Sequence, residues 1–178
     1  ITTSSSTLSS NSRMNIILLD KQQHDRQRFD CQNQVLNQYL TQIASQQAQK
    51  DNARTYVLID PVNSSWIMGF YTLTMTTLDL STLPLQLQKK HASVSSVGLI
   101  ARLAVDHRYQ KQGLGAILLL DALHRLHQAS AIVAFPLVLV DAKDGIAEFY
   151  QQYGFQALSQ YPNKLFMTMK DIAHNIAP

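Results

Sequence analysis

The segment from Arg102 to Ala116 joins an apolar run to a loop with two glycines, Gly113 and Gly115, and then to a helical pattern. A junction of this kind leaves backbone N–H groups free at a helix start, where they bind anions such as phosphate. Glycine has no Cβ, so the main chain at these two positions can approach a pyrophosphate closely. The segment lacks both the Gly-Lys-Ser/Thr triplet of a Walker loop and the Gly-x-Gly-x-x-Gly of a dinucleotide fold. By itself, the loop predicts either a diphosphate site or an ordinary strand-to-helix turn.

A second segment, residues 147–155, reads Ala-Glu-Phe-Tyr-Gln-Gln-Tyr-Gly-Phe and follows the apolar run 137–140. Gly154 suits the left-handed residue that ends a short helix, and Phe155 then opens a strand. Together with the loop from Gln110 to Gly115, this segment resembles the two signature blocks of the GNAT superfamily of N-acetyltransferases, Gln/Arg-x-x-Gly-x-Gly/Ala and FYxxxGF. The resemblance implies a single-domain α/β GNAT fold, with a mixed central sheet and helices on both faces. It also implies acetyl-CoA as the acetyl donor and no metal.

The resemblance further implies which residues bind acetyl-CoA. In GNAT enzymes the central strand splays from its neighbour, and its free backbone groups bind the pantetheine amides and stabilise the developing oxyanion. Here those groups belong to Leu103, Ala104 and Val105, which on their own read as plain core strand residues. The pyrophosphate is expected on the loop and the helix start, formed by Gln110, Lys111, Gln112, Gly113, Leu114, Gly115 and Ala116.

Tyr150 is the expected catalytic residue, because the corresponding tyrosine of the resembling family lies beside the CoA sulfur. A phenol has a pKa of about 10 and is protonated at neutral pH, so it can give its proton to the departing thiolate. On sequence alone, packing in the core is the more common role for such a tyrosine, and Tyr153 is a further packing or entrance residue. No general base is recognisable. That favours an α-amine acceptor, whose pKa of about 7.7–8.0 is far below the value of about 10.4 for lysine.

Most of the chain from 29 to 176 is similar to one GNAT branch, the toxins of bacterial toxin–antitoxin pairs. The similar segments are Phe29-Asp30-Cys31 with the helix after it, 100–106, and 165–171, whereas Asp141 stands where many of these toxins carry a histidine. The resemblance implies acetylation of the α-amine of aminoacyl-tRNA and arrest of translation. It also implies neutralisation by a ribbon-helix-helix antitoxin, operator DNA bound through the antitoxin complex with transcription repression, and a homodimer as an option.

Two other interpretations stay open. The same chemistry can acetylate a small-molecule amine or a protein N-terminus. A narrow, acidic acceptor cleft would favour a small-molecule amine such as a polyamine or aminoglycoside. A non-catalytic regulator would bind DNA together with its antitoxin. The net charge of +3 and the pI of about 9.0 are compatible with a polyanionic partner but do not require one.

Four basic residues are candidates for contacts with the acceptor: Arg102, Lys89, Lys90 and Arg108. Arg102 lies between apolar strand residues, so it needs either a partner or access to a cleft. It can contact RNA phosphates, or it can form a salt bridge with Asp79, Asp106 or another acid. The alternative for the other three is a solvated surface.

The composition sets further limits. A chain of 178 residues with 46% hydrophobic residues and no internal repeat fits one domain, expected over 14–178. Residues 1–13 are rich in serine and threonine and lack the core of a signal peptide, so we expect a disordered or cloning-derived tail, with Met14 at or near the natural start. Cys31 is the only cysteine, so no disulfide can form within the chain, which favours the cytoplasm. The Cys31 side chain is expected to be buried. The longest apolar run, 131–140, is about half a bilayer span, so no membrane segment is expected.

Hydrophobic periodicity predicts the elements that must position these residues. Asp30 is the expected N-cap of the first helix, and His124 and His127 are expected on the surface, because no acidic or cysteine ligand accompanies them. The expected order is strand 15–19, helix 31–49, strands 54–60 and 66–76, an irregular insert 78–93, strand 94–105, helix 113–133, strand 136–140, helix 145–153, and strands 155–158 and 164–170.

Overall fold

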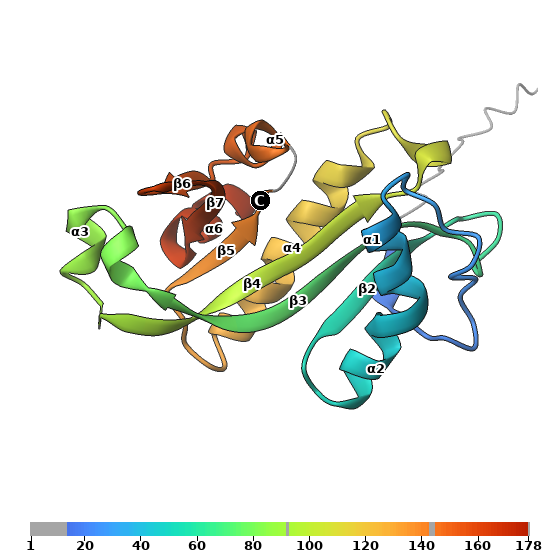
Figure 1. The fold of residues 1–178 in the computed structure, drawn as a ribbon, viewed down its shortest axis with the longest axis horizontal. Helices are drawn as coiled ribbons and strands as arrows, with labels where there is room; N and C mark the ends of the chain where they lie inside the picture. The colour runs from blue at the N-terminus through green and yellow to red at the C-terminus, as the bar shows by residue number, and fades with distance from the viewer. Residues whose placement is uncertain (1–13, 92, 143–144, 178) are drawn as a thin grey trace, which may run out of the picture.

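The computed structural model describes residues 14–91, 93–142 and 145–177, so the predicted tail over 1–13 lies outside the described residues. Within the described part, one seven-stranded sheet has the order β1-β2-β3-β4-β5-β7-β6 (Figure 1). The strands are β1 (Asn15–Leu18), β2 (Arg54–Ile59), β3 (Ile67–Asp79), β4 (Val94–Val105), β5 (Leu137–Asp141), β6 (Gln156–Leu158) and β7 (Tyr161–Thr168).

The sheet is antiparallel except between β4 and β5, which are parallel and joined by the long helix α4 (Leu114–Ser130). Their pairing covers only Gly98, Leu99 and Ile100 on β4, opposite Val138–Val140. Beyond Ile100, β4 runs on beside β3, while β5 ends at Asp141 and the two strands diverge (Figure 1). The sheet is therefore split at the carboxyl ends of its two central strands, a place where α/β proteins commonly bind ligands.

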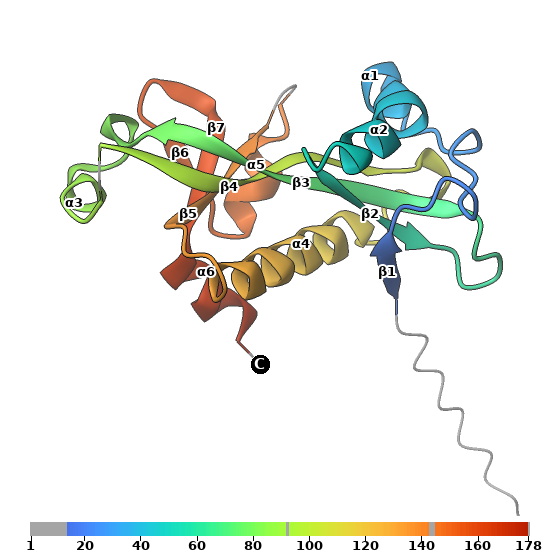
Figure 2. The same cartoon turned by 90° about the horizontal axis from the view of Figure 1, so that it is seen from below.

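Helices cover both faces of the sheet (Figure 2). One face carries α1 (Gln34–Gln38), the π-helical turn η1 (Tyr39–Ile43) and α2 (Ala44–Gln49) over β2 to β4. The other face carries α4 and α6 (Met169–Ile176). The shorter elements are η2 (Leu80–Thr82), α3 (Leu85–Gln88), η3 (His107–Tyr109) and α5 (Ala147–Gln152), of which α5 follows β5.

The core under α4 follows from the sequence pattern. Leucines recur at helical spacing from Leu114 through Leu118 to Leu126, and this stripe is buried against Val138 and Val140 of β5. Burying each large aliphatic side chain contributes about 1.5–3 kcal/mol. The helix is thereby fixed against the strand that precedes it and the strand that follows it. The start of α4 is consequently held at the split in the sheet.

The predicted element order is confirmed, with corrections at several ends. The last strand was expected to reach Lys170, but β7 ends at Thr168 and helix α6 begins at Met169. The Thr168 side chain accepts a hydrogen bond from the Asp171 backbone N–H at 3.2 Å and donates to its carboxylate at 2.9 Å. The sequence contains this Thr-x-x-Asp cap, but the apolar run 165–167 followed by Met169 favours a strand that continues past it.

The first helix also differs from its prediction. Its N-cap is Asn33 rather than Asp30, since the Asn33 side chain accepts a hydrogen bond from the Leu36 N–H. The expected single helix over 31–49 is α1 and α2 separated by the π-helical turn η1. The insert over 78–93 is partly absorbed by β3, which continues to Asp79. The other two helices are shorter than expected: α4 spans 114–130 and α5 spans 147–152.

Candidate active site

The loop between β4 and α4 has the backbone geometry of an anion site. Lys111 has φ +62° and Gly113 has φ +76°, so two left-handed residues, separated only by Gln112, precede the helix. Gly113 is the N-cap of α4 and has no side chain to cap the first N–H groups. The amides of Leu114, Gly115 and Ala116 therefore stay available at the positive end of a 17-residue helix. Consecutive amides in such a turn form a concave anion site.

A cleft of about 180 Å³ opens over this loop. Phe149 of α5 and Tyr153, the C-cap of this helix, close its far side, and the Phe149 ring lies 3.5 Å from where a Cβ on Gly115 would stand. The predicted coenzyme residues that line it are Val105, Gln110, Lys111, Gly113, Leu114, Gly115 and Ala116. Gln112 instead lines a separate hollow with Tyr109 and Asp60, and the Gln110 side chain donates to the Val105 carbonyl at 3.2 Å. The cradle is thus built mainly from backbone.

The free edge of β4 supplies the second predicted contact. On the side facing β5, residues 101–105 have no strand partner in the described residues. Pairing with β3 shifts between Thr72 and Leu73, which leaves Ala101 as an extra residue, a β-bulge that bends the strand where the split begins. Ala104 packs in the core, Leu103 lines the acceptor-side cleft described below, and Val105 lines the coenzyme cleft. The side chains of residues 103–105 can therefore pack while their backbone groups remain free to bind the coenzyme.

Tyr150 lies where the two clefts approach each other. Its ring packs edge-on against Phe149 at 5.1 Å and Phe155 at 5.6 Å between centroids, and only 7% of the residue is exposed. Burial raises the pKa of Tyr150 to about 12, because the phenolate would lose its hydration. The phenol makes no hydrogen bond to any described residue, and Tyr150 lines the acceptor side. It is therefore a protonated donor on the wall of the acceptor-side cleft, next to Phe149 of the coenzyme cleft.

The acceptor-side cleft has a volume of about 350 Å³ and crosses the split in the sheet. Its walls are Asn33, Val35 and Leu36 near α1 on one side, and Asp141, Ala142, Ile146 and Tyr150 on the other, with residues 100–103 of β4 as its floor. Val35 and Ile146 are exposed at its mouth. The cleft therefore combines apolar walls with one arginine and one aspartate.

Arg102 is positioned by an aromatic ring rather than by an acid. Its guanidinium lies 3.6 Å from the ring centroid of Tyr39, a residue that is only 2% exposed. The salt bridge considered with Asp79 or Asp106 is wrong: Asp79 pairs with Val94 at the opposite end of β4, and Asp106 binds Arg108. Arg102 lines both the acceptor cleft and an adjoining hollow of about 330 Å³. A guanidinium stacked by its face keeps its N–H edge free for a ligand.

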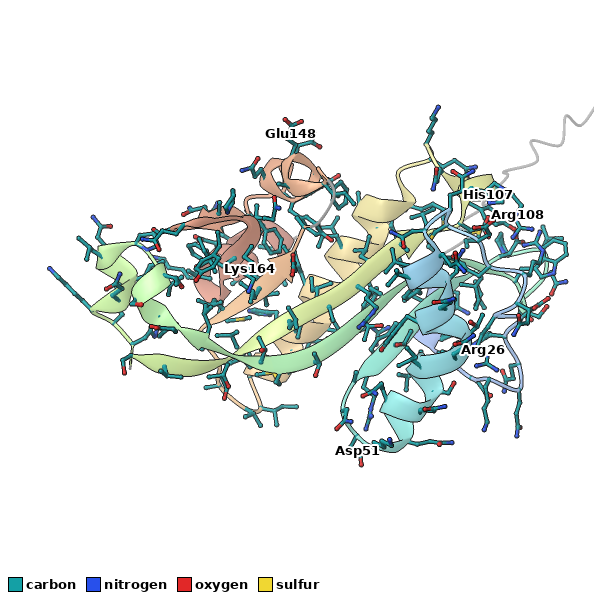
Figure 3. All side chains as sticks on the ribbon, viewed as in Figure 1. Arg26, Asp51, His107, Arg108, Glu148 and Lys164 are labelled. Carbon is teal, nitrogen blue, oxygen red and sulfur yellow. The ribbon has the colours of Figure 1, made fainter. Side chains whose placement is uncertain are left out.

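Arg108 is committed to a structural contact, which corrects its expected place on the acceptor side. Its side chain donates to both carboxylate oxygens of Asp106, at 2.9 and 2.7 Å, and to the Arg28 carbonyl. Burial alone would raise the pKa of Asp106, but these hydrogen bonds and those from two backbone amides hold it below its usual value. Figure 3 shows Arg108 beside His107 at the end of the molecule that carries α1.

Lys89 and Lys90 also lie away from the expected place. They follow α3, which precedes β4, whereas the coenzyme loop follows β4. A strand of 12 residues separates the two ends, roughly 40 Å at 3.3 Å per residue. Neither lysine lines either cleft.

Residues outside the predicted set complete the site. Tyr39, Val35, Leu36 and Ile146 form its acceptor side, and nothing in their sequence spacing singles them out from ordinary helix and loop residues. His124 is exposed on α4, as expected, and contacts Gln128. The described residues contain no cluster of three or more histidine, cysteine, aspartate or glutamate side chains that could hold a metal, and no helix among them is long and apolar enough to cross a bilayer.

A sheet split between its two central strands, a backbone anion cradle after β4 and a buried phenol on the wall of the neighbouring cleft are the features expected of an acyl-CoA-dependent acyltransferase. The sequence comparison agrees, since residues 90–167 match the model of the acetyltransferase (GNAT) domain. A solved structure described as AtaTR bound with AcCoA is 30% identical, with 92% of this chain and 98% of that chain covered and a TM-score of 0.79. The chain therefore belongs to the GNAT family, and it is an acetyl-CoA-dependent N-acetyltransferase.

Three further similarities lie in one branch of the family. The chain is 26% identical, over 86% of its length and 90% of the relative's, to a probable toxin TacT of Sinorhizobium fredii. It is 28% identical to AtaT complexed with acetyl-methionyl-tRNAfMet, over 92% of this chain and 99% of that one, with a TM-score of 0.84. An AtaT mutant toxin bound to the C-terminus of the antitoxin AtaR and acetyl-CoA is also 28% identical, over 93% and 99%, with a TM-score of 0.78.

Proposed function

We propose that this chain is a toxin that transfers the acetyl group of acetyl-CoA to the α-amine of aminoacyl-tRNA and thereby stops translation. The carrying observation is the acceptor cleft, which is lined by Tyr150, the neighbour of Phe149 in the coenzyme cleft, and has apolar walls beside a stacked, accessible arginine. Apolar walls suit an amino-acid side chain, and an arginine suits the phosphates or ribose of the tRNA end. The similarity to a toxin solved with acetyl-methionyl-tRNA supports this acceptor over others.

The chain's own groups bind the coenzyme in two stretches. The uncapped amides of 114–116 face the pyrophosphate, and the free β4 edge at Leu103, Ala104 and Val105 bonds the pantetheine amides. Acetyl-CoA supplies a thioester carbonyl that an amine can attack. A backbone N–H of the free edge stabilises the negative charge on that carbonyl oxygen, an interaction worth roughly 3–4 kcal/mol in comparable sites.

Tyr150 completes the transfer as the general acid. The amine nitrogen forms the new C–N bond, the C–S bond breaks with its electron pair on sulfur, and the Tyr150 hydroxyl donates its proton to that sulfur. The proton lost by the amine passes to solvent, and one proton from solvent restores the phenol. With its pKa raised to about 12, the phenol stays protonated at pH values of about 8 to 11, where the amine is already mostly neutral.

The lack of an evident general base in the cleft is consistent with an α-amine as the acceptor. Among the lining residues of the cleft, the carboxylate of Asp141 is the single acidic group, and it is exposed at the rim. A lysine or polyamine acceptor would arrive almost fully protonated and would need a positioned base. An aminoacyl ester has an amine that is mostly neutral slightly above pH 7 and needs none.

The partners follow from the same branch of the family. We infer a ribbon-helix-helix antitoxin that neutralises the toxin and through which operator DNA is bound, a homodimer as the assembly, and a cytoplasmic location, where charged tRNA is found. The similarity to a toxin bound to the C-terminus of its antitoxin supports the first of these.

The acceptor is tested with radiolabelled acetyl-CoA and three substrates: charged tRNA, the same tRNA deacylated, and free amino acid. We expect label in charged tRNA alone, released with the aminoacyl group on mild alkaline hydrolysis. Equal labelling of charged and deacylated tRNA, or labelling of the free amino acid at a similar rate, would contradict the proposal.

A further inference from the structure

The segment before α1 is fastened to the end of β4 by polar contacts. The Asp30 backbone N–H donates to the Asp106 carboxylate at 2.9 Å, and the His107 N–H donates to the Asp30 carbonyl at 2.8 Å. The His107 Nδ1 lies 2.9 Å from the same carbonyl, which fixes that nitrogen as the protonated one. Asp106 is fully buried and also holds Arg108. These hydrogen bonds attach residues 28–31 to the end of β4, from which the coenzyme loop continues.

Asn37 of α1 is attached to this segment at both ends of its carboxamide. Its Nδ2 donates to the Asp30 carboxylate at 2.9 Å, and its Oδ1 accepts from the Cys31 backbone N–H at 3.0 Å and from the Cys31 thiol at 3.2 Å. A carboxylate can only accept and a backbone N–H can only donate, so an amide in this one orientation satisfies both. Neither aspartate nor leucine, which match asparagine in shape, can make both contacts.

Within its own five residues, helix α1 has few contacts with the hydrophobic core. It has five residues, none of which is buried, and Leu36 is its single residue that packs against the neighbouring core. Yet α1 supplies Val35 and Leu36 to the wall of the acceptor cleft, and it leads into the π-helical turn that places Tyr39 beneath Arg102. The core therefore anchors the C-terminal end of α1 through Tyr39 and Leu40, whereas polar contacts hold its N-terminal end.

We propose that Asn37 is a positioning residue for acetyl transfer, which holds helix α1, and with it the acceptor wall, in register with the coenzyme-bearing end of β4. This inference deepens the proposed function and rests on it. Asn37 touches neither cleft, so it acts through Asp30 and Cys31. A misplacement of about 1 Å at a reacting centre can cost roughly 100-fold in rate. The hydrogen bonds of the Asn37 side chain to Asp30 and Cys31 are called the tie below. Loss of the tie is accordingly expected to impair use of the acceptor and to leave coenzyme binding intact.

The test compares Asn37→Ala with Thr41→Ala, a control on the same side of the helix. The Thr41 hydroxyl donates to the Asn37 and Gln38 carbonyls, so its loss perturbs the helix without touching the tie. For Asn37→Ala we expect kcat/KM for charged tRNA to fall roughly 10- to 100-fold, mainly through KM, with the calorimetric Kd for acetyl-CoA within about twofold of wild type. Thr41→Ala should retain both values. Equal kinetics in the two variants, or a loss of acetyl-CoA binding as large as the loss in acceptor use, would overturn the proposal.

A second pair keeps the test decisive if Asn37→Ala folds poorly. Asp30→Asn keeps an acceptor oxygen for the Asn37 amide, whereas Asp30→Ala removes it, so the first should recover most of the acceptor kinetics and the second should not. Equal defects in both would count against the tie. If the wild-type protein acetylates no charged tRNA, the proposed function fails, and amide exchange then judges the tie by itself. Faster exchange over 34–38 in Asn37→Ala, but not in Thr41→Ala, supports it, and unchanged exchange refutes it.

Discussion

The two sides of the catalytic site are built from different materials. The coenzyme side consists of backbone: a free strand edge, a left-handed glycine and the uncapped amides of α4. The acceptor side consists of side chains from separate parts of the chain, with Arg102 stacked on Tyr39 and α1 held by Asn37. A backbone site tolerates sequence change and suits a coenzyme shared by a family, whereas a side-chain site can change with the acceptor. Substitutions should therefore separate the two sides.

The largest effect is expected where the two sides meet. Tyr150→Phe removes the proton donor and keeps the ring that packs against Phe149 and Phe155, so kcat should fall about 100- to 10,000-fold. Tyr153→Phe, which lines only the coenzyme cleft, is the matched control and should keep most of the activity. Rapid-quench acetyl transfer to charged tRNA measures both. A kcat for Tyr150→Phe within threefold of wild type would remove the general-acid role.

The next effect isolates the acceptor side. Arg102→Met keeps a long apolar stem over Tyr39 and removes the charge, so KM for charged tRNA should rise about tenfold or more, while the Kd for acetyl-CoA stays constant. Arg125→Met is a control from the opposite face, because Arg125 also stacks on a tyrosine, Tyr56, at 4.2 Å. It should lower the melting temperature and leave KM unchanged. If both variants raise KM equally, Arg102 has no special contact with the acceptor.

A smaller effect isolates the coenzyme side. Gly113 at φ +76° and Gly145 at φ +78° share a left-handed backbone and open space around a would-be Cβ. Alanine at either position should cost about 1–2 kcal/mol of folding free energy. Only Gly113→Ala should weaken acetyl-CoA, by about tenfold or 1.4 kcal/mol, as measured by calorimetry. Equal affinities in the two variants would show that the turn at Gly113 does not shape the coenzyme site.

The sequence predicts the coenzyme side of the site better than the acceptor side, because the first is built from local backbone and the second from side chains distant in the chain. The strand, the glycine loop and Tyr150 lie within two short segments, so local pattern and family resemblance suffice to find them. The contacts of Arg102 with Tyr39 and of Asp30 with Asp106 join residues 63 and 76 positions apart, and no local pattern records them. The sequence likewise shows the charge of Arg108, Lys89 and Lys90, but it does not show that Arg108 binds Asp106 or that the two lysines lie outside both clefts.

A last prediction concerns pH and stability. The folded-state pKa of Tyr150 is about 12, above the value of about 10 for an unfolded tyrosine, so the folded protein retains a proton that the unfolded chain loses. The resulting stabilisation is present below pH 10 and is lost as the pH rises from 10 to 12. The unfolding free energy of the wild type, measured by denaturant melts, should therefore fall relative to that of Tyr150→Phe across that window, by on the order of 2 kcal/mol. Parallel curves would mean that the phenol is not desolvated.

Binding of the coenzyme by the β4–α4 turn is tested most directly by hydrogen–deuterium exchange with and without saturating acetyl-CoA. Peptides covering 103–116 should exchange more slowly with the coenzyme, with the strongest protection over 113–116, while the peptide covering α3 stays unchanged as an internal reference. Unchanged exchange over 113–116 in the presence of bound acetyl-CoA would contradict the assignment of this turn as the coenzyme site.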